Sequence, residues 1–230
     1  MKPLLSESED NDALLALGRA SVQIVHDLKN QLNGLKLYAT FLRKRLEKTE
    51  RPADELETIQ KLIAGLDRSS SDLSMIVEFG HPLQLKRQPG TDLEKVLREV
   101  ATGLNGRQEV SGPLTGLLVI DAEPGSFLGE FDSVSLAGAL KSISLGAAKL
   151  ANSQKPSGAL EIRLRGNGSG TTRQGVIEWP ISDFSDHDPF HSFAGSNEIR
   201  LSLAARVIEA HGGSAQRQEG SLCVSLPLTA

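Results

Sequence analysis

The sequence predicts an α+β protein in which an antiparallel helical hairpin precedes an α/β sandwich. Two observations support this class. Apolar residues in the first third of the chain recur with alternating spacings of three and four, the heptad pattern of long packed helices. From Gly90 onward, short apolar runs typical of strands alternate with amphipathic stretches typical of helices. We therefore expect a hairpin domain over residues 12–80 and an α/β domain over residues 90–230.

Length and composition limit the class of protein further. The chain has 230 residues, 39% of them hydrophobic, which is enough to build well-packed cores. Its 25 Lys and Arg against 29 Asp and Glu give a net charge of −4, and 4% of residues are aromatic, so we expect no nucleic-acid binding. The single cysteine, Cys223, excludes an internal disulfide and a multi-cysteine zinc site. With no secretory signal or membrane-spanning run recognised, we expect a cytoplasmic protein that does not bind membranes.

The first predicted helix carries one continuous apolar seam. Its members are Leu14, Gly18, Ser21, Val25, Leu28, Leu32, Leu35, Ala39, Leu42 and Leu46. The gaps between them alternate between four and three residues, which places them along one side of a helix. The acidic residues before Ala13 are expected to form a frayed tail.

A second seam follows a break at residues 49–53. Its members are Leu56, Ile59, Ile63, Leu66, Ser70, Leu73 and Val77. Asp54 and Glu57 have the spacing of a capping box, and Gly80 with Pro82 is a typical helix end. One hairpin cannot bury its apolar stripe completely. We therefore expect two hairpins to pair into a four-helix bundle, which makes the protein a homodimer.

The second part of the chain reads as a sheet covered by helices. The segment 81–89 has no clear period and is expected to be a linker. The expected helices are 92–104, 132–151 and 198–211, and the expected strands are 117–121, 159–165, 176–181 and 222–226. The economical arrangement places the helices on one face of a single sheet.

His26 is the histidine whose position on a helix the seam determines. If Val25 is heptad position a and Leu28 position d, His26 is position b and points away from the seam. Asn30 and Asn33 share its face, four and seven residues further on. A neutral imidazole is a competent nucleophile near neutral pH.

Two residues next to this histidine add chemistry to it. Asp27 supplies a carboxylate at the following position, and Lys29 supplies a cation beside Asn30. An exposed imidazole with these neighbours could accept and donate a phosphoryl group. The alternative is a solvated histidine among ordinary polar residues of a helix surface, and composition alone does not decide between them.

Two segments resemble parts of the bacterial two-component sensor histidine kinases. The run His26-Asp27-Leu28-Lys29-Asn30 resembles their H-box, a histidine followed by an acid and, four residues after the histidine, by Asn or Thr. The segment 201–213, closing in Glu-Ala-His-Gly-Gly, is similar to the stretch after the last glycine box of their Bergerat-type ATP-binding domain. The resemblance extends over residues 14–228. It implies a dimerisation and histidine phosphotransfer hairpin followed by a sandwich of the histidine kinase ATPase type.

The same resemblance implies roles for individual residues. His26 would carry the phosphoryl group, Asp27 would activate or orient the ring, and Asn30 would position water when a partner's phospho-aspartate is hydrolysed. Lys29 and Asn30 are candidates for contact with the transferring group. Adjacent helix residues do not face each other, so Asp27 has to reach sideways. His211 is expected to be a cation at a helix C-terminus, followed by Gly212 as a left-handed stop.

The nucleotide-binding motifs of that family are not recognisable in this chain. Ser142 and Gly146 occupy the pattern positions of the asparagines that would hold magnesium. Ser196, Glu198 and Arg200 stand where glycines would let the polyphosphate approach the backbone. The ATP site is therefore expected to be degenerate.

Three loop features carry weaker signals. Near the expected adenine turn, Asp183 has no glycine two or four residues later, and Gly195 remains alone. The glycine-rich segment 166–170 is expected to be a hairpin turn rather than a phosphate loop, because no helix follows it. His187 and His191 alternate with two aspartates that could bind a metal, although such a cluster is more often a solvated loop.

A retained phospho-acceptor with a degenerate ATP site resembles the ChpT-type histidine phosphotransferases. The implied function is the relay of phosphoryl groups between receiver-domain aspartates through a phosphohistidine, without ATP binding. It implies no cofactor in this chain, with Mg²⁺ in the partner, and it implies response-regulator receiver domains and a hybrid histidine kinase as partners. Two alternatives stay open: an active or phosphatase-biased sensor kinase core with a diverged nucleotide site, and a non-catalytic dimeric adaptor for two-component proteins.

Overall fold

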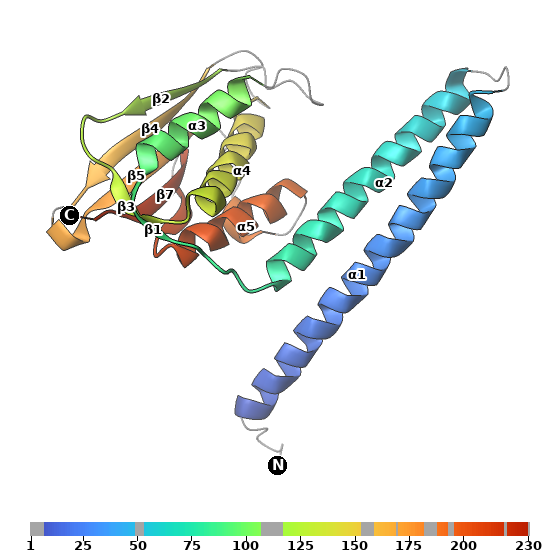
Figure 1. Ribbon diagram of the computed structural model, residues 1–230, viewed down its shortest axis with the longest axis horizontal. Coiled ribbons are helices and arrows are strands. Elements are labelled where there is room, and N and C mark those ends of the chain that lie inside the picture. The colour runs from blue at the N-terminus through green and yellow to red at the C-terminus, as the bar shows by residue number, and fades with distance from the viewer. Residues whose placement is uncertain are drawn as a thin grey trace. The chain divides into compact units, whose positions relative to one another are not determined.

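The computed structural model describes residues 7–48, 53–106, 117–152, 159–168, 170–181, 188–192, 196–218 and 220–229. The chain divides into two compact units, Met1–Pro82 and Leu83–Ala230. Two long helices make up the first, and strands and helices make up the second (Figure 1). The α+β class is confirmed.

The first unit is a hairpin of α1 (Glu7–Leu46) and α2 (Ala53–Gly80), which lie side by side (Figure 1). Because α1 begins at Glu7, the expectation of a frayed tail up to Ala13 was wrong; acidic residues favour the first turns of a helix through the helix dipole. The second helix ends at Gly80, as predicted. It begins one residue before Asp54, so this residue lies inside the first turn rather than at the cap.

The apolar seam of α1 is only partly covered by α2. Its a positions face α2, since Ala39 is buried and Val25, Leu32 and Leu46 are half-buried. The large apolar residues at the d positions and at two neighbouring g positions stay between 44% and 68% exposed. These residues form what we call the α1 stripe: Ile24, Leu28, Leu35, Tyr38 and Leu42. A single hairpin therefore leaves a row of large apolar side chains exposed.

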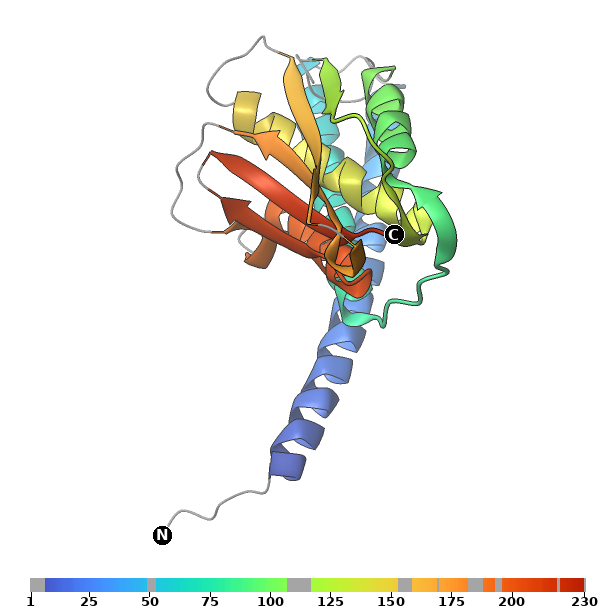
Figure 2. The same ribbon diagram turned by 90° about the vertical axis from the view of Figure 1, so that its left-hand side faces the viewer.

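The second unit is a sandwich of one five-stranded sheet and three helices. Its elements are β2 (Leu118–Ala122), β4 (Leu160–Asn167), β5 (Gln174–Pro180), β6 (Ser214–Gln218), β7 (Ser221–Pro227), α3 (Leu93–Asn105), α4 (Ser133–Asn152) and α5 (Ser196–Ala210). The strand order is β2-β4-β5-β7-β6, with a parallel β2–β4 pair and antiparallel pairs elsewhere. The helices lie on one face of the sheet, as predicted (Figure 2).

The core lies between the sheet and the helices. Along β4, Ile162 and Leu164 are fully buried, while Glu161 and Arg163 are exposed. On α4, Leu136, Leu140 and Ile143 are also fully buried, at the spacing of one helix face. Among the described residues, the segment Ser133–Ala151 of α4 is long and apolar enough to cross a membrane, with a mean hydropathy of 1.2. Because Leu136, Leu140 and Ile143 of this segment are buried against the sheet side of the unit, α4 is typical of a core helix.

Three strands were not predicted. The strands β1 (Gln88–Asp92) and β3 (Leu128–Phe131) form a separate antiparallel pair. Gln88 and Pro89, expected to belong to a linker, thus belong to β1. Proline and glycine are uncommon inside strands, so Pro89 and Gly90 hid the strand pattern; Gly90 has a φ of 72°. The edge strand β6 is polar, and only Ala215 in it is buried. Edge strands with one buried residue lack the apolar alternation that sequence patterns detect.

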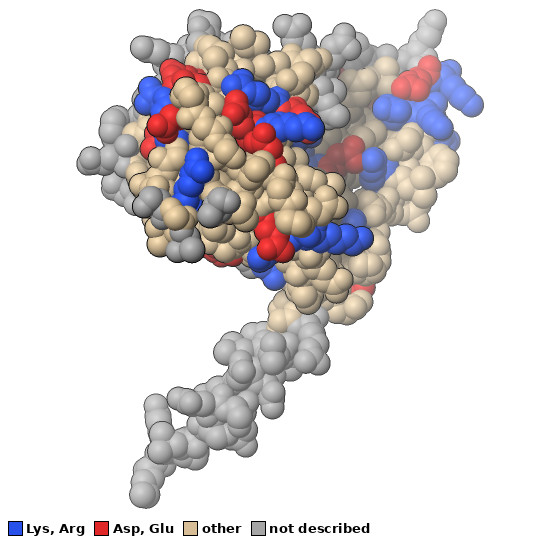
Figure 3. All heavy atoms as spheres, turned by 60° about the vertical axis from the view of Figure 1, so that its left-hand side comes forward, with Lys and Arg blue, Asp and Glu red and all other residues tan. Residues whose placement is uncertain are grey.

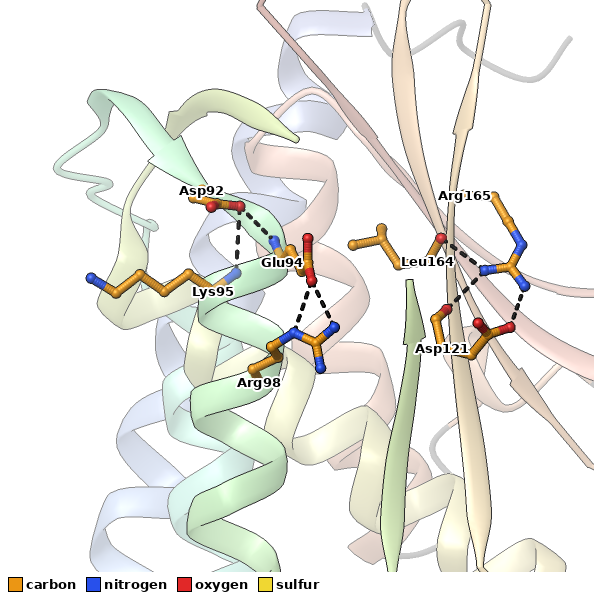
Figure 4. A network of polar contacts seen from close by, with 7 residues as sticks. All are labelled: Asp92, Glu94, Lys95, Arg98, Asp121, Leu164 and Arg165. Carbon is orange, nitrogen blue, oxygen red and sulfur yellow. Dashed lines mark hydrogen bonds and ion pairs between the residues drawn. The ribbon is translucent and has the colours of Figure 1, made fainter. Parts of the chain in front are cut away.

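Polar contacts fix the start of α3 and the exposed side of the sheet (Figure 4). Asp92 caps α3 by accepting the backbone N–H groups of Glu94 (3.0 Å) and Lys95 (3.4 Å). On the sheet, the Arg165 guanidinium donates to the carboxylate of Asp121 and to its carbonyl (2.8 Å).

Acidic and basic side chains are interspersed on the face shown in Figure 3. This face carries mixed charge, unlike the basic surfaces that bind nucleic acids.

His211 is a buried structural residue, so the expected helix-terminal cation was wrong. Its side chain is 1% exposed. Its Nδ1 lies 2.8 Å from the Val207 carbonyl, to which it donates, and its Nε2 accepts the N–H of Asp132 (3.0 Å). Burial lowers the pKa of His211, and the charge of Arg87 lowers it further. The neutral ring therefore ties the end of α5 to the start of α4. The helix stop at Gly212, with a φ of 81°, is as predicted.

The burial of His211 predicts an acid-sensitive second unit. In the unfolded chain its pKa returns to about 6.5. As the pH falls through this value, the unfolded state gains a proton that the folded state resists, so the free energy of unfolding falls. The Asp132 carboxyl affects the free energy of unfolding in a separate range, below pH 3.8. Backbone N–H groups, that of Ser135 foremost, lower its pKa, so protonation of this carboxyl by acid also destabilises the fold.

Fluorescence of Trp179, the single tryptophan, which is fully buried in this unit, measures the effect in urea titrations. A His211→Leu variant is expected to lose about 1–3 kcal/mol at pH 8, because the Asp132 N–H is left unpaired, and to lose the slope between pH 5 and 7. His191→Leu, at an exposed histidine of the same unit, is the control. A slope that survives in His211→Leu would contradict the assignment.

Candidate functional site

His26 lies on the exposed side of α1. Its side chain is 56% exposed. Residues two apart on a helix point about 160° away from each other, so His26 faces nearly opposite to Leu28 of the α1 stripe. A partner that covers the stripe would therefore leave the imidazole accessible.

Two side chains approach the same ring nitrogen of His26. The Asn30 Nδ2 lies 3.4 Å from Nδ1, and the Asp27 Oδ1 lies 3.5 Å from Nδ1. In the described part of the chain, Nε2 has no hydrogen-bond or ionic partner. A proton on Nδ1 is favoured by the nearby Asp27 carboxylate, and Nε2 then carries the lone pair of the nucleophile. The ion-pair distance shows that Asp27 does reach sideways towards the ring.

Lys29 lies on a neighbouring flank. This residue is half-buried on the side of α1 that faces α2. Asn33, which shares the face of His26, accepts a hydrogen bond from the Ser70 hydroxyl of α2 (3.2 Å), and Lys36 forms an ion pair of 2.5 Å with Asp67 of α2. The structure thus brings His26, Asp27 and Asn30 together, while the polar residues further along this side hold the two helices in register.

Sequence reasoning missed Gln23. Its Nε2 donates to Asp27 Oδ1 at 3.1 Å. Gln23 precedes Asp27 by four residues, so the spacing alone places the two side chains on one helix face. That spacing was the signal that could have found it.

The residues on α4 do not fit a magnesium–ATP site. Ser142 donates its hydroxyl to the Gly138 carbonyl (3.1 Å), inside its own helix. Gly146 is buried, and a Cβ added there would lie 2.9 Å from the side chain of Leu201 on α5. An asparagine at this position would collide with a fully packed leucine. The two positions at which the resemblance expects magnesium-binding asparagines therefore offer one hydroxyl oxygen, that of Ser142, and no side-chain oxygen at Gly146.

The start of α5 fits a polyphosphate no better. Residues that replace the expected glycines belong to its first turns, and Glu198 accepts a hydrogen bond from the Ser192 hydroxyl. Asn197 accepts a hydrogen bond from Lys149 of α4 (2.7 Å), which joins the two helices. At the positions where the resemblance expects glycines next to the phosphates, this chain has the first turns of α5 and the carboxylate of Glu198. Asp183 and Gly195 lie outside the described residues.

The two remaining loop candidates are the glycine-rich segment and the histidine–aspartate cluster. Gly166 and Asn167 end β4, and the connection to the antiparallel β5 includes Gly168, with a φ of 80°, and a short 3-10 helix, Gly170–Thr172. The two strands therefore form a hairpin, as expected. The histidine–aspartate cluster is described only in part, since residues 182–187 lie outside the description. His191 is exposed and pairs with Asp188 at 3.0 Å. No group of three or more His, Cys, Asp or Glu among the described residues could hold a metal ion.

Comparisons with known proteins extend these observations. No protein-family model matches the sequence, and no curated protein matches it. Among solved structures, the histidine kinase ThkA, in complex with the response regulator protein TrrA, aligns with a TM-score of 0.59 and 17% identity over 97% of this chain and 65% of that chain. ShkA, solved at full length in complex with AMPPNP, aligns with a TM-score of 0.58 and 19% identity over 90% of this chain and 45% of that chain.

A third structure matches over its whole length. The histidine kinase AdeS of Acinetobacter baumannii aligns with a TM-score of 0.56 and 16% identity over 89% of this chain and 98% of that chain. This chain spans less than half of ShkA and about two thirds of the ThkA chain. Identities this low show the fold alone. The chain therefore has the fold of a histidine kinase core, a helical hairpin followed by a sandwich of the histidine kinase ATPase type.

Proposed function

We propose that this protein is a histidine phosphotransferase that relays phosphoryl groups between receiver-domain aspartates through His26. One observation carries the proposal: an exposed imidazole with a carboxylate at Nδ1 and an unengaged Nε2 lies on a kinase-like hairpin. The packing of Leu201 against Gly146 supports transfer without ATP.

The proposed step is a reversible substitution at phosphorus. The lone pair of His26 Nε2 attacks the phosphorus of a receiver's aspartyl phosphate, an N–P bond forms, and the P–O bond breaks with its electron pair leaving on the receiver's carboxylate. The ring keeps its proton on Nδ1 and becomes positively charged, and Asp27 stabilises this charge at close range. The carboxylate of a second receiver then attacks the phosphoramidate and restores the neutral imidazole.

Metal chemistry is assigned to the partner. Charge on the transferring phosphoryl group would be neutralised by Mg²⁺ in the receiver's acidic pocket, so this chain needs no cofactor of its own. Asn30 lies one turn from His26 and is the candidate for positioning the phosphoryl group, or water in a phosphatase reaction. The proposed partners are cytoplasmic response-regulator receiver domains and a hybrid histidine kinase.

The proposed assembly is a homodimer. The α1 stripe exposes five large apolar side chains along one side of a helix. A second copy offers the same stripe, and pairing two hairpins buries both in a four-helix bundle. His26 faces away from this contact, so each subunit would keep its imidazole available.

The source of the phosphoryl group tests this function. The full chain is incubated separately with radiolabelled ATP–Mg²⁺ and with receiver domains labelled by acetyl phosphate, and acid-labile, base-stable label is then counted on the chain. We expect label from a phosphorylated receiver and none from ATP. Label from ATP would assign a kinase with a diverged nucleotide site. Label from neither source would assign a non-catalytic adaptor.

A further inference from the structure

We infer that Gln23 is a positioning residue that selects the reactive tautomer of His26 by holding Asp27. The inference rests on the proposed function, and it concerns a residue three positions before the phospho-acceptor. Asp27 Oδ1, the atom that faces His26 Nδ1, is also the atom that accepts the hydrogen bond from Gln23 Nε2 (3.1 Å). Gln23 therefore restrains the carboxylate at the point where it meets the ring.

The need for such a restraint follows from the competition at Nδ1. Asp27, a carboxylate, can only accept, so its charge 3.5 Å from Nδ1 favours a proton there and leaves Nε2 as the nucleophile. Asn30 approaches Nδ1 through its amide nitrogen, which can only donate, so this contact requires a bare Nδ1 and moves the proton to Nε2. The two contacts are close in length, 3.5 Å and 3.4 Å, and they favour opposite tautomers.

The position of Asp27 decides this competition. Adjacent residues on a helix do not face each other, so an unrestrained Asp27 side chain has no helical reason to turn towards His26. Gln23 lies one turn before Asp27 on the same face and supplies a fixed donor. Because all these side chains are exposed, the effect is that of a surface i,i+4 hydrogen bond, roughly a twofold change in the tautomer ratio.

Nitrogen-15 NMR of the histidine side chains at pH 8 tests the inference on the full chain. We expect Gln23→Met to lower the ratio of Nδ1–H to Nε2–H tautomer at His26 roughly twofold, and to slow labelling by a phosphorylated receiver by a similar factor. Gln23→Lys retains a donor for Asp27 and is expected to restore the wild-type tautomer ratio. Asn30→Ala removes the competing donor, so the ratio is expected to rise.

A matched control separates this effect from a general change in the helices. Gln60 is an exposed glutamine of α2, and Gln60→Met should leave the His26 spectrum unchanged. An unchanged tautomer ratio in Gln23→Met, or an equal change in Gln60→Met, would overturn the inference. A tautomer shift in a protein that no receiver labels would instead refute the proposed function and leave the positioning role intact.

Discussion

Replacing His26 with glutamine is expected to abolish labelling by a phosphorylated receiver, a loss of at least about a thousandfold, because the proposed phosphohistidine forms on the His26 ring. Glutamine has an amide in place of the nucleophilic ring nitrogen. Since the His26 side chain is more than half exposed, the free energy of unfolding should change by less than about 0.5 kcal/mol. Label transfer is measured in time courses with equal amounts of each variant.

Two controls make this loss interpretable. His191→Gln changes another exposed histidine, in the second unit, and should leave labelling intact. Circular dichroism at the helical wavelengths shows whether the hairpin of His26→Gln remains folded. Wild-type labelling in His26→Gln would place the phospho-acceptor at another residue and would remove the basis of the proposed function.

Replacing Leu35 with glutamate is expected to convert the protein from a dimer to a monomer. In the proposed bundle Leu35 lies in the buried contact, and symmetry places the substitution in both subunits. Losing the burial of two leucines costs about 3 kcal/mol or more, which raises the dissociation constant at least about a hundredfold. Sedimentation equilibrium measures the change, with twice the chain mass expected for the wild type.

The same helix offers a matched control for this substitution. Leu37 is 54% exposed, the same fraction as Leu35, but it lies nearly opposite on the helix and outside the proposed contact. Leu37→Glu should therefore leave the dimer intact. A wild-type protein that is monomeric, or equal dissociation of the two variants, would refute the proposed dimer.

The elements with strong periodicity were predictable from sequence. The seam members of α1 and α2 repeat over many turns, and a long repeat allows few alternatives. The helix stop at Gly212 was also predictable, because glycine readily adopts the left-handed conformation. The start of α1 was misplaced, since charged residues that favour a helix through its dipole leave no apolar signal.

Contacts between distant segments were not predictable. The role of His211 depends on Asp132, which lies 79 residues away, and local sequence suggested a terminal cation instead. The packing of Leu201 on Gly146 likewise joins two helices that are far apart in the chain. Gln23 was missed although its partner is local, because a polar pair on a helix surface is common and carries no marker of function.

The sequence by itself determined the class of the fold, the heptad seams and the side of α1 on which His26 lies, because all of these follow from the period of the helix and strand. The tertiary structure decided which half of the seam stays exposed, which histidine is buried and neutral, and which side chain packs against Gly146. These properties depend on residues brought together by packing, which the spacing of residues along one segment does not encode.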